Sequence, residues 1–137
     1  STGQGWYVYI ETSFPRQVND TARILSPTIK ADGSQKSIHC VSFWYHMYGP
    51  HVDTLRLYQK VGSTLGKPKW VRQGDQGNQW IQGENTVEHT KDVQVILVMR
   101  SAIHNLQQFG HPFLFQESNN FVQKFFITNE FLFEWYR

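Results

Sequence analysis

The sequence is poor in three things: cysteine, charge and long apolar runs. Cys40 is the single cysteine, so no disulfide can form within the chain, and taken alone this composition suits a reducing compartment. Charged residues make up 18% of the 137 residues and the net charge is +2, which is too small for a nucleic-acid-binding surface. No stretch of about 18 consecutive apolar residues occurs, so the sequence predicts no membrane-spanning helix.

The basic residues are scattered apart from one group. Lys67, Lys69 and Arg72 lie close together around Pro68, and we interpret this group as a solvent-exposed loop rather than a phosphate contact. What the sequence does contain is aromatic residues, at 15%. Low charge and high aromatic content favour a β-rich globular domain over disorder. The length suits one domain.

Short alternating segments separated by Gly, Pro, Asn and Asp fill the first hundred residues, which is the pattern of an antiparallel all-β domain. Strands are predicted over residues 6–11, 21–25, 37–48, 54–61, 69–73, 79–83 and 93–99. No segment of this region keeps a helical period. The expected architecture is therefore two sheets packed face to face.

The strongest predicted strand covers residues 37–48, and both of its faces carry large side chains. We expect a central strand that is buried at least partly on each side. Gly49-Pro50 ends it, and the next strand, 54–61, turns Leu55 and Leu57 inward. Two such strands joined by a short loop predict a hairpin.

Past Arg100 the composition changes. Of the ten phenylalanines, only Phe14 and Phe43 precede this point. The stretch 121–136 is apolar and β-prone with few charges, which makes an unpaired version of it an aggregation hazard. It fits either a replacement hairpin or a loosely attached extension, and periodicity does not distinguish the two.

The residues of the central strand identify a family. The run Cys40-Val-Ser-Phe-Trp-Tyr-His-Met-Tyr-Gly49 closely resembles the central strand of MAM domains, the ectodomain modules named from meprin, neuropilin and receptor tyrosine phosphatase mu. Further segments resemble family signatures in the same order, over residues 5–13, 21–27, 54–58, 74–80 and 93–98. The resemblance covers about residues 5–100. It implies an antiparallel jelly-roll-like β-sandwich whose signature core includes Trp44, Tyr45, His46, Tyr48, Gly49 and Trp80.

Two departures from the family pattern bear on completeness. The family has an upstream strand with cysteines, and a closing acidic strand with a final cysteine to which the resemblance would pair Cys40. Neither is present in this sequence. We therefore expect a partial module over residues 1–100, an incomplete sandwich, with a divergent Phe-rich tail over residues 101–137. An odd cysteine in a secreted protein indicates a missing partner or a free thiol.

Metal binding is not the favoured interpretation of the polar residues. His39 and His46 lie seven apart in one strand and so point to opposite faces, while His104 and His111 belong to the tail. No zinc-ligand spacing is found. Asp75 and Asp53 are the candidates for calcium, but few oxygens accompany them, and Asp75 is better explained by a turn that its carboxylate shapes.

Catalysis has no support in the sequence. The serines lack a nucleophile elbow, the carboxylates are dispersed, and the Gly-rich segments 62–66 and 74–77 lead into no phosphate-binding helix. We therefore expect no cofactor and predict that the chain is not an enzyme.

Two kinds of surface feature are left open. Trp44, Trp70 and Trp80 are assigned to the core rather than to a ligand platform, whereas Trp6 and Tyr9 belong to a strand whose tyrosine face could be exposed. Asn19-Asp20-Thr21 is a glycosylation sequon in a turn-rich region.

The expected function follows from the resemblance. It implies a non-catalytic extracellular recognition module that mediates protein–protein contacts, with homophilic contact as one form, in adhesion or in oligomerisation of a cell-surface or secreted parent protein. One alternative is a carbohydrate-binding sandwich, because jelly rolls are common in lectins. Another is a truncated variant without an independent function.

Overall fold

The computed structural model describes residues 8–11, 19–33, 35–50, 52–101, 122–127 and 134–136. These residues form strands and loops without a helix, so none of the described segments is a helix long and apolar enough to cross a membrane. The strands are β1 (Val8–Glu11), β2 (Thr21–Leu25), β3 (Ser37–His46), β4 (Val52–Val61), β5 (Thr64–Gln73), β6 (Ile81–His89), β7 (Val93–Ser101), β8 (Val122–Ile127) and β9 (Glu134–Tyr136).

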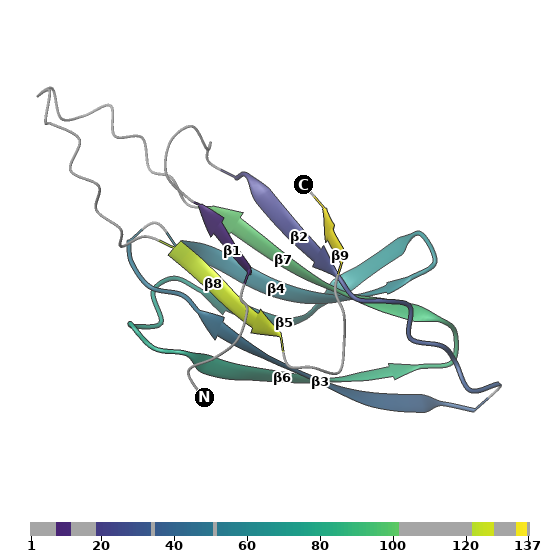
Figure 1. The fold of residues 1–137 in the computed structure, drawn as a ribbon. Coiled ribbons are helices and arrows are strands. Elements are labelled where there is room, and N and C mark those ends of the chain that lie inside the picture. The colour runs from purple at the N-terminus through teal and green to yellow at the C-terminus, as the bar shows by residue number, and fades with distance from the viewer. Residues whose placement is uncertain are drawn as a thin grey trace, which may run out of the picture.

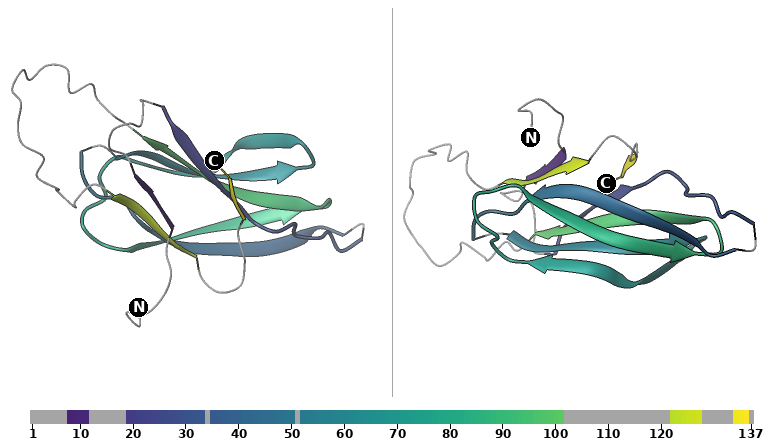
Figure 2. Two further views of the ribbon diagram at one scale, coloured as in Figure 1. Left: turned by 45° about the horizontal axis from the view of Figure 1, so that its top comes forward. Right: turned by 90° about the horizontal axis from the view of Figure 1, so that it is seen from below.

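The described strands form two antiparallel sheets. Sheet A has the order β1-β8-β3-β6 and sheet B the order β5-β4-β7-β2-β9. The two sheets lie face to face over much of their length, as Figures 1 and 2 show. The predicted all-β sandwich is confirmed, and so is the central position of β3, which pairs with β6 on one side and β8 on the other.

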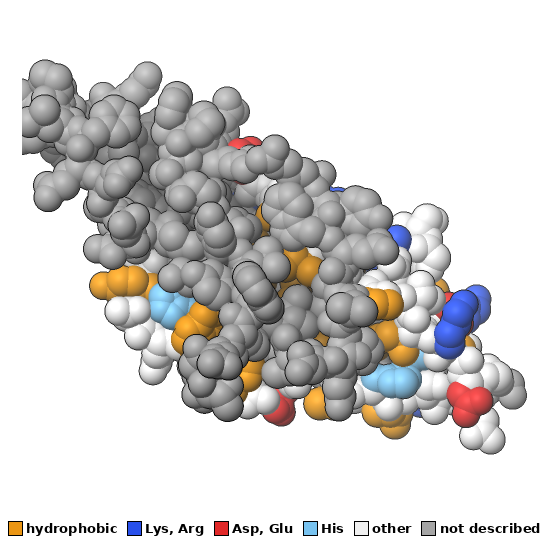
Figure 3. Space-filling view, viewed as in Figure 1, with side chains coloured by type: hydrophobic (Ala, Val, Ile, Leu, Met, Phe, Trp, Pro, Cys, Tyr) orange, Lys and Arg blue, Asp and Glu red, His pale blue; other side chains and the backbone are white. Residues whose placement is uncertain are grey.

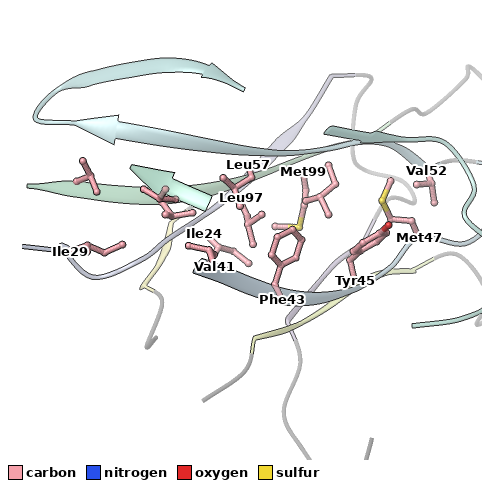
Figure 4. Close-up of a cluster of buried hydrophobic side chains, with 14 residues drawn as sticks. Ile24, Ile29, Val41, Phe43, Tyr45, Met47, Val52, Leu57, Leu97 and Met99 are labelled. Carbon is pink, nitrogen blue, oxygen red and sulfur yellow. The ribbon is translucent and has the colours of Figure 1, made fainter. Parts of the chain in front are cut away.

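The core lies between the sheets and follows the two-residue period of the strands. Odd-numbered residues of β3 and of the residues just after it point inward: Val41, Phe43, Tyr45 and Met47 are all buried. They meet Leu57, Leu97 and Met99 of sheet B (Figure 4). Trp70 of β5 closes the core edge-on, with its ring 5.1 Å from that of Phe43 and 5.3 Å from that of Tyr45.

The predicted hairpin between residues 37–48 and 54–61 is wrong. β3 and β4 share no ladder, because the short connection at Gly49-Pro50 carries the chain from sheet A to sheet B. The inward side chains Val41, Phe43 and Tyr45 of β3 and Leu55 and Leu57 of β4 are apolar, and in opposite sheets they bury one another. Gly49 takes φ 108°, a conformation that glycine adopts without steric cost.

The basic group Lys67-Pro-Lys69 was expected in a loop, but it lies within strand β5. Because β5 is an edge strand, the missing N–H of Pro68 costs no central ladder bond. Register shifts near Tyr58 accommodate it. The expected exposure is confirmed for Lys67, Lys69 and Arg72.

Two segments of the predicted tail take part in the sheets. β8 lies between β1 and β3 in sheet A, and β9 pairs with β2 at the edge of sheet B. These segments are therefore part of the sandwich rather than outside it. The division of the chain at residue 100 stays a prediction, and residues 102–121 lie outside the described part of the structure.

Candidate functional site

Among the described residues, an aromatic surface lies at the end of β3. We call His46, Tyr48 and Trp80 the aromatic cluster, because the His46 ring contacts both of the other rings. The His46 ring centroid lies 6.3 Å from that of Tyr48 and 5.5 Å from that of Trp80. Tyr48 is 38% exposed and Trp80 36% exposed, whereas His46 is half-buried. Figure 3 shows hydrophobic side chains beside histidines along the lower margin of the visible face.

The aromatic cluster exists because β3 presents its even-numbered residues away from the second sheet. Trp44 and His46 are half-buried and Tyr48 is exposed, while Tyr45 between them is fully buried. The signature residues were expected together in the core. That expectation is wrong for Tyr48 and Trp80, because alternate residues of a strand point to opposite faces of its sheet. Gly49 is buried.

The loop of residues 74–80 positions Trp80. Its backbone is tied to both sheets: Gly74 N–H donates to the carbonyl of Asp53 at 2.7 Å, and Gln76 N–H donates to that of Met47 at 2.7 Å. Asn78 Oδ1 then lies 3.0 Å from Nε2 of His46. The loop therefore links the end of β3 to the start of β4 and carries Trp80 against the His46 ring.

The two calcium candidates have structural contacts instead. Asp75 Oδ1 accepts the Gly77 N–H at 2.8 Å, which is the turn-shaping role predicted for it. Asp53 Oδ2 lies 3.2 Å from Nε of Arg100 in an ion pair. Within the described ranges no three His, Cys, Asp or Glu side chains are grouped so that they could hold a metal ion.

The histidines occupy separate places. His39 faces the core side of β3 and stacks on His89 with ring centroids 5.1 Å apart, whereas His46 belongs to the aromatic cluster on the opposite face. His89 Nδ1 lies 2.8 Å from the carbonyl of Lys91. The predicted opposite orientation of His39 and His46 is confirmed. His104, His111 and Trp6 lie outside the described residues, and for Tyr9 only the strand position in β1 is described.

Asn19 and Cys40 are both on the surface. Asn19 is exposed in a turn before β2, takes φ 74° and accepts a hydrogen bond from the Arg100 guanidinium. Cys40 is a free thiol, exposed on the outer face of β3. Glycosylation of Asn19 and pairing of Cys40 with a cysteine of another segment stay predictions.

A second surface was missed by the sequence interpretation. Arg23, Arg56 and Arg100 lie far apart in the chain, but β2, β4 and β7 are neighbours in sheet B and bring them to one face. The signal in the sequence was the position of an arginine next to inward-facing apolar residues, such as Arg56 between Leu55 and Leu57. That the three arginines lie on one surface depends on the strand order β4-β7-β2, which the sequence did not show.

Comparisons with known proteins match this architecture. The family model described as MAM domain, meprin/A5/mu matches residues 1–110. MAM domain-containing glycosylphosphatidylinositol anchor protein 1 of Rattus norvegicus is 38% identical over 97 residues, which cover 69% of this chain and 10% of that protein.

Two further relatives show similar figures. MAM domain-containing glycosylphosphatidylinositol anchor protein 2 of Mus musculus is 35% identical over 100 residues, which cover 68% of this chain and 10% of that protein. Neuropilin-1a of Danio rerio is 35% identical over 99 residues, covering 69% of this chain and 10% of its own length. The matched part of the chain thus spans a tenth of the length of these relatives.

Proposed function

This chain belongs to the MAM domain family, and we propose that it is a non-catalytic recognition module in the extracellular part of a cell-surface or secreted protein. The relatives support the location: two are named as glycosylphosphatidylinositol anchor proteins, and such an anchor holds a protein at the membrane without a transmembrane helix. Its role is to mediate protein–protein contact, in adhesion or in oligomerisation of the parent.

The aromatic cluster is the contact surface we propose. Tyr and Trp are enriched among residues that dominate binding free energy, because they bury a large area and lose little conformational entropy. Exposed Tyr48 and Trp80 are held in place by His46 and by the tethered loop. Asn78, Gln79 and Gln82 are exposed around them and supply a polar rim.

The single observation that carries the proposal is that Trp80 is exposed at the end of a loop whose backbone is hydrogen-bonded to residues of both sheets. Its loop is hydrogen-bonded to Met47 and Asp53, so the indole does not have to be ordered at the moment of binding. An aromatic side chain that only filled the core would not be left 36% exposed in a loop with these tethers.

A bead-aggregation assay tests the proposal in its homophilic form. We expect beads coated with the chain to aggregate, and Trp80→Ala or Tyr48→Ala to reduce the aggregation strongly. Leu65→Ala is the matched control, because Leu65 is 44% exposed on the turn side of β5, away from the aromatic cluster. It should leave aggregation unchanged.

A heterophilic partner is tested by binding the chain to an array of cell-surface ectodomains with the same variants. If neither assay shows binding that depends on Trp80 or Tyr48, the aromatic cluster is not the contact surface. A glycan array distinguishes the carbohydrate-binding alternative: binding of neutral sugars abolished by Trp6→Ala or Tyr9→Ala would replace the protein-contact proposal.

A further inference from the structure

The outer face of sheet B is a basic surface formed by side chains that alternate with core residues. Leu55 and Leu57 of β4 are buried, so Arg56 between them points outward. The same alternation turns Arg23 of β2 and Lys60 of β4 to this face, together with Arg100 of β7. We call Arg23, Arg56, Lys60 and Arg100 the basic face.

The ladder register places these cations at defined intervals. Arg23 pairs with Val98 of β7, and Val98 pairs with Arg56 of β4. The two arginines thus occupy one row across the sheet, two strand spacings or about 10 Å apart at the backbone. Lys60 lies four residues further along β4, and Arg100 lies two residues along β7 in the other direction. The cations are spread over the face rather than gathered at one point.

Acidic partners are few among the described side chains of this face. Asp53 pairs with Arg100, and Lys60 Nζ donates to the neutral Gln94 amide at 3.1 Å. Arg23 and Arg56 have no carboxylate partner among the described side chains. In the register, β9 places Tyr136 opposite Arg23 and Glu134 opposite Leu25.

The opposite face of the sandwich differs in sign. On sheet A, Glu84 and Glu88 of β6 are exposed, and Lys36 is held in an ion pair with Glu88 at 2.6 Å. Among the described residues, the exposed carboxylates Glu84 and Glu88 on the outer face of sheet A thus contrast with the arginines on the outer face of sheet B. Lys67 and Lys69 are exposed on the edge strand β5.

We propose that the basic face binds a linear sulfated polysaccharide. A sulfate group accepts the paired N–H donors of a guanidinium, so spaced arginines suit a polymer with repeated sulfates. Between Arg23 and Arg56 the floor is half-buried Val98, and Tyr58 lies on the adjacent row. This apolar floor suits the C–H faces of sugar rings.

The same features argue against other anionic partners. β2, β4 and β7 are each paired on both sides, so an acidic peptide cannot join this face by adding a strand. Val98 and Tyr58 are half-buried and do not protrude as membrane-inserting side chains do. The surface is distinct from the aromatic cluster, so the proposal stands or falls independently of the protein-contact function.

The test measures binding of the full chain to a fluorescent heparin-type oligosaccharide and to a fully desulfated oligosaccharide of equal length. We expect binding of the sulfated probe alone, weakening as salt is raised. Arg23→Ala combined with Arg56→Ala should weaken it about tenfold or more, because two charge-assisted contacts are lost. Arg23→Lys with Arg56→Lys should give an intermediate loss.

The control removes the same number of charges elsewhere. Lys30 and Lys36 are paired with Asp92 and Glu88, so Lys30→Ala with Lys36→Ala should change affinity by less than the arginine pair does. If both double variants lost the same affinity for the sulfated probe, the loss would be explained by net charge alone, and the proposal would be overturned. Equal binding of the desulfated probe, or equal arginine-dependent binding of polyglutamate or phosphatidylserine vesicles, would also overturn it.

A footprint on the unsubstituted chain keeps the test independent of variant folding. Acetylation of Lys60 should slow when the sulfated oligosaccharide is present, while acetylation of Lys36 should not. Equal protection of both lysines, or of neither, contradicts binding at the basic face.

Discussion

The ring of Phe43 fills the space that a side chain at Gly83 would need. The two residues are direct partners in the β3–β6 ladder, and a Cβ placed on Gly83 would lie 2.6 Å from Cζ and 2.8 Å from Cε2 of the ring. Phe43 is 1% exposed and packs edge-on against Trp70. The glycine therefore lets a large aromatic ring lie flat over the neighbouring strand.

Gly83→Ala should destabilise the fold by about 1–3 kcal/mol, because the buried ring has no free space to move into. The measurement is the free energy of unfolding in urea. Phe43→Leu with Gly83→Ala should be less destabilising than the sum of the single variants, since a smaller side chain leaves room for the methyl group. Thr86→Ala on the exposed face of β6 is the control; a similar loss there would disprove the steric explanation.

Ser26 continues the β2–β7 ladder where Pro27 would interrupt it. Its Oγ accepts the Val95 N–H at 2.8 Å, and its own N–H donates to the Val95 carbonyl at 2.9 Å. Ser26→Ala should cost about 1–3 kcal/mol, because the buried Val95 N–H is left without an acceptor. Thermal unfolding measures it. Ser26→Thr, which keeps the hydroxyl, should lose less, and an equal loss would point to packing instead.

The pKa of Asp92 connects a surface contact to acid stability. The carboxylate accepts hydrogen bonds from Lys30 Nζ at 2.7 Å and from the Ala31 N–H at 2.9 Å, which hold its pKa below the usual 3.8. A lowered pKa stabilises the fold at pH values above the unfolded value, and this contribution is lost as pH falls through the folded pKa.

Asp92→Asn should therefore lower Tm slightly at neutral pH, and the difference from the unsubstituted chain should shrink below pH 3.8. The effect is small because both partners are exposed and screened by solvent. The Tm difference between the two proteins is measured from melting curves at about seven pH values between roughly pH 2 and pH 7. A difference that grew on acidification would contradict the assignment.

Cys40 should react with a thiol reagent in the folded chain about as fast as in denaturant, because it is exposed on β3. Absorbance of the released leaving group gives both rates. In an oxidising buffer the parent ectodomain should show a disulfide from Cys40 to a cysteine outside residues 1–137. Slow, denaturant-dependent labelling would mean that the outer face of sheet A is covered at this position.

Local alternation was enough to predict much of the strand content. Thr21–Leu25 was placed without error, Leu55 and Leu57 face inward as expected, and residues 37–46 of the predicted 37–48 form the central strand β3. These features depend on a period of two that neighbouring residues display, so no long-range information is needed. The turn made by Asp75 is likewise local, since its acceptor and donor are two residues apart.

The tertiary structure decided which strands are neighbours. The sequence by itself determined an antiparallel all-β chain of the MAM type with an inward and an outward face on each strand. It could not show that β3 and β4 lie in opposite sheets or that Trp80 stays exposed, because alternation describes one strand at a time. Ladder pairing joins residues more than 70 positions apart, as Arg23 and Val98 are, and through these pairings scattered arginines become one surface.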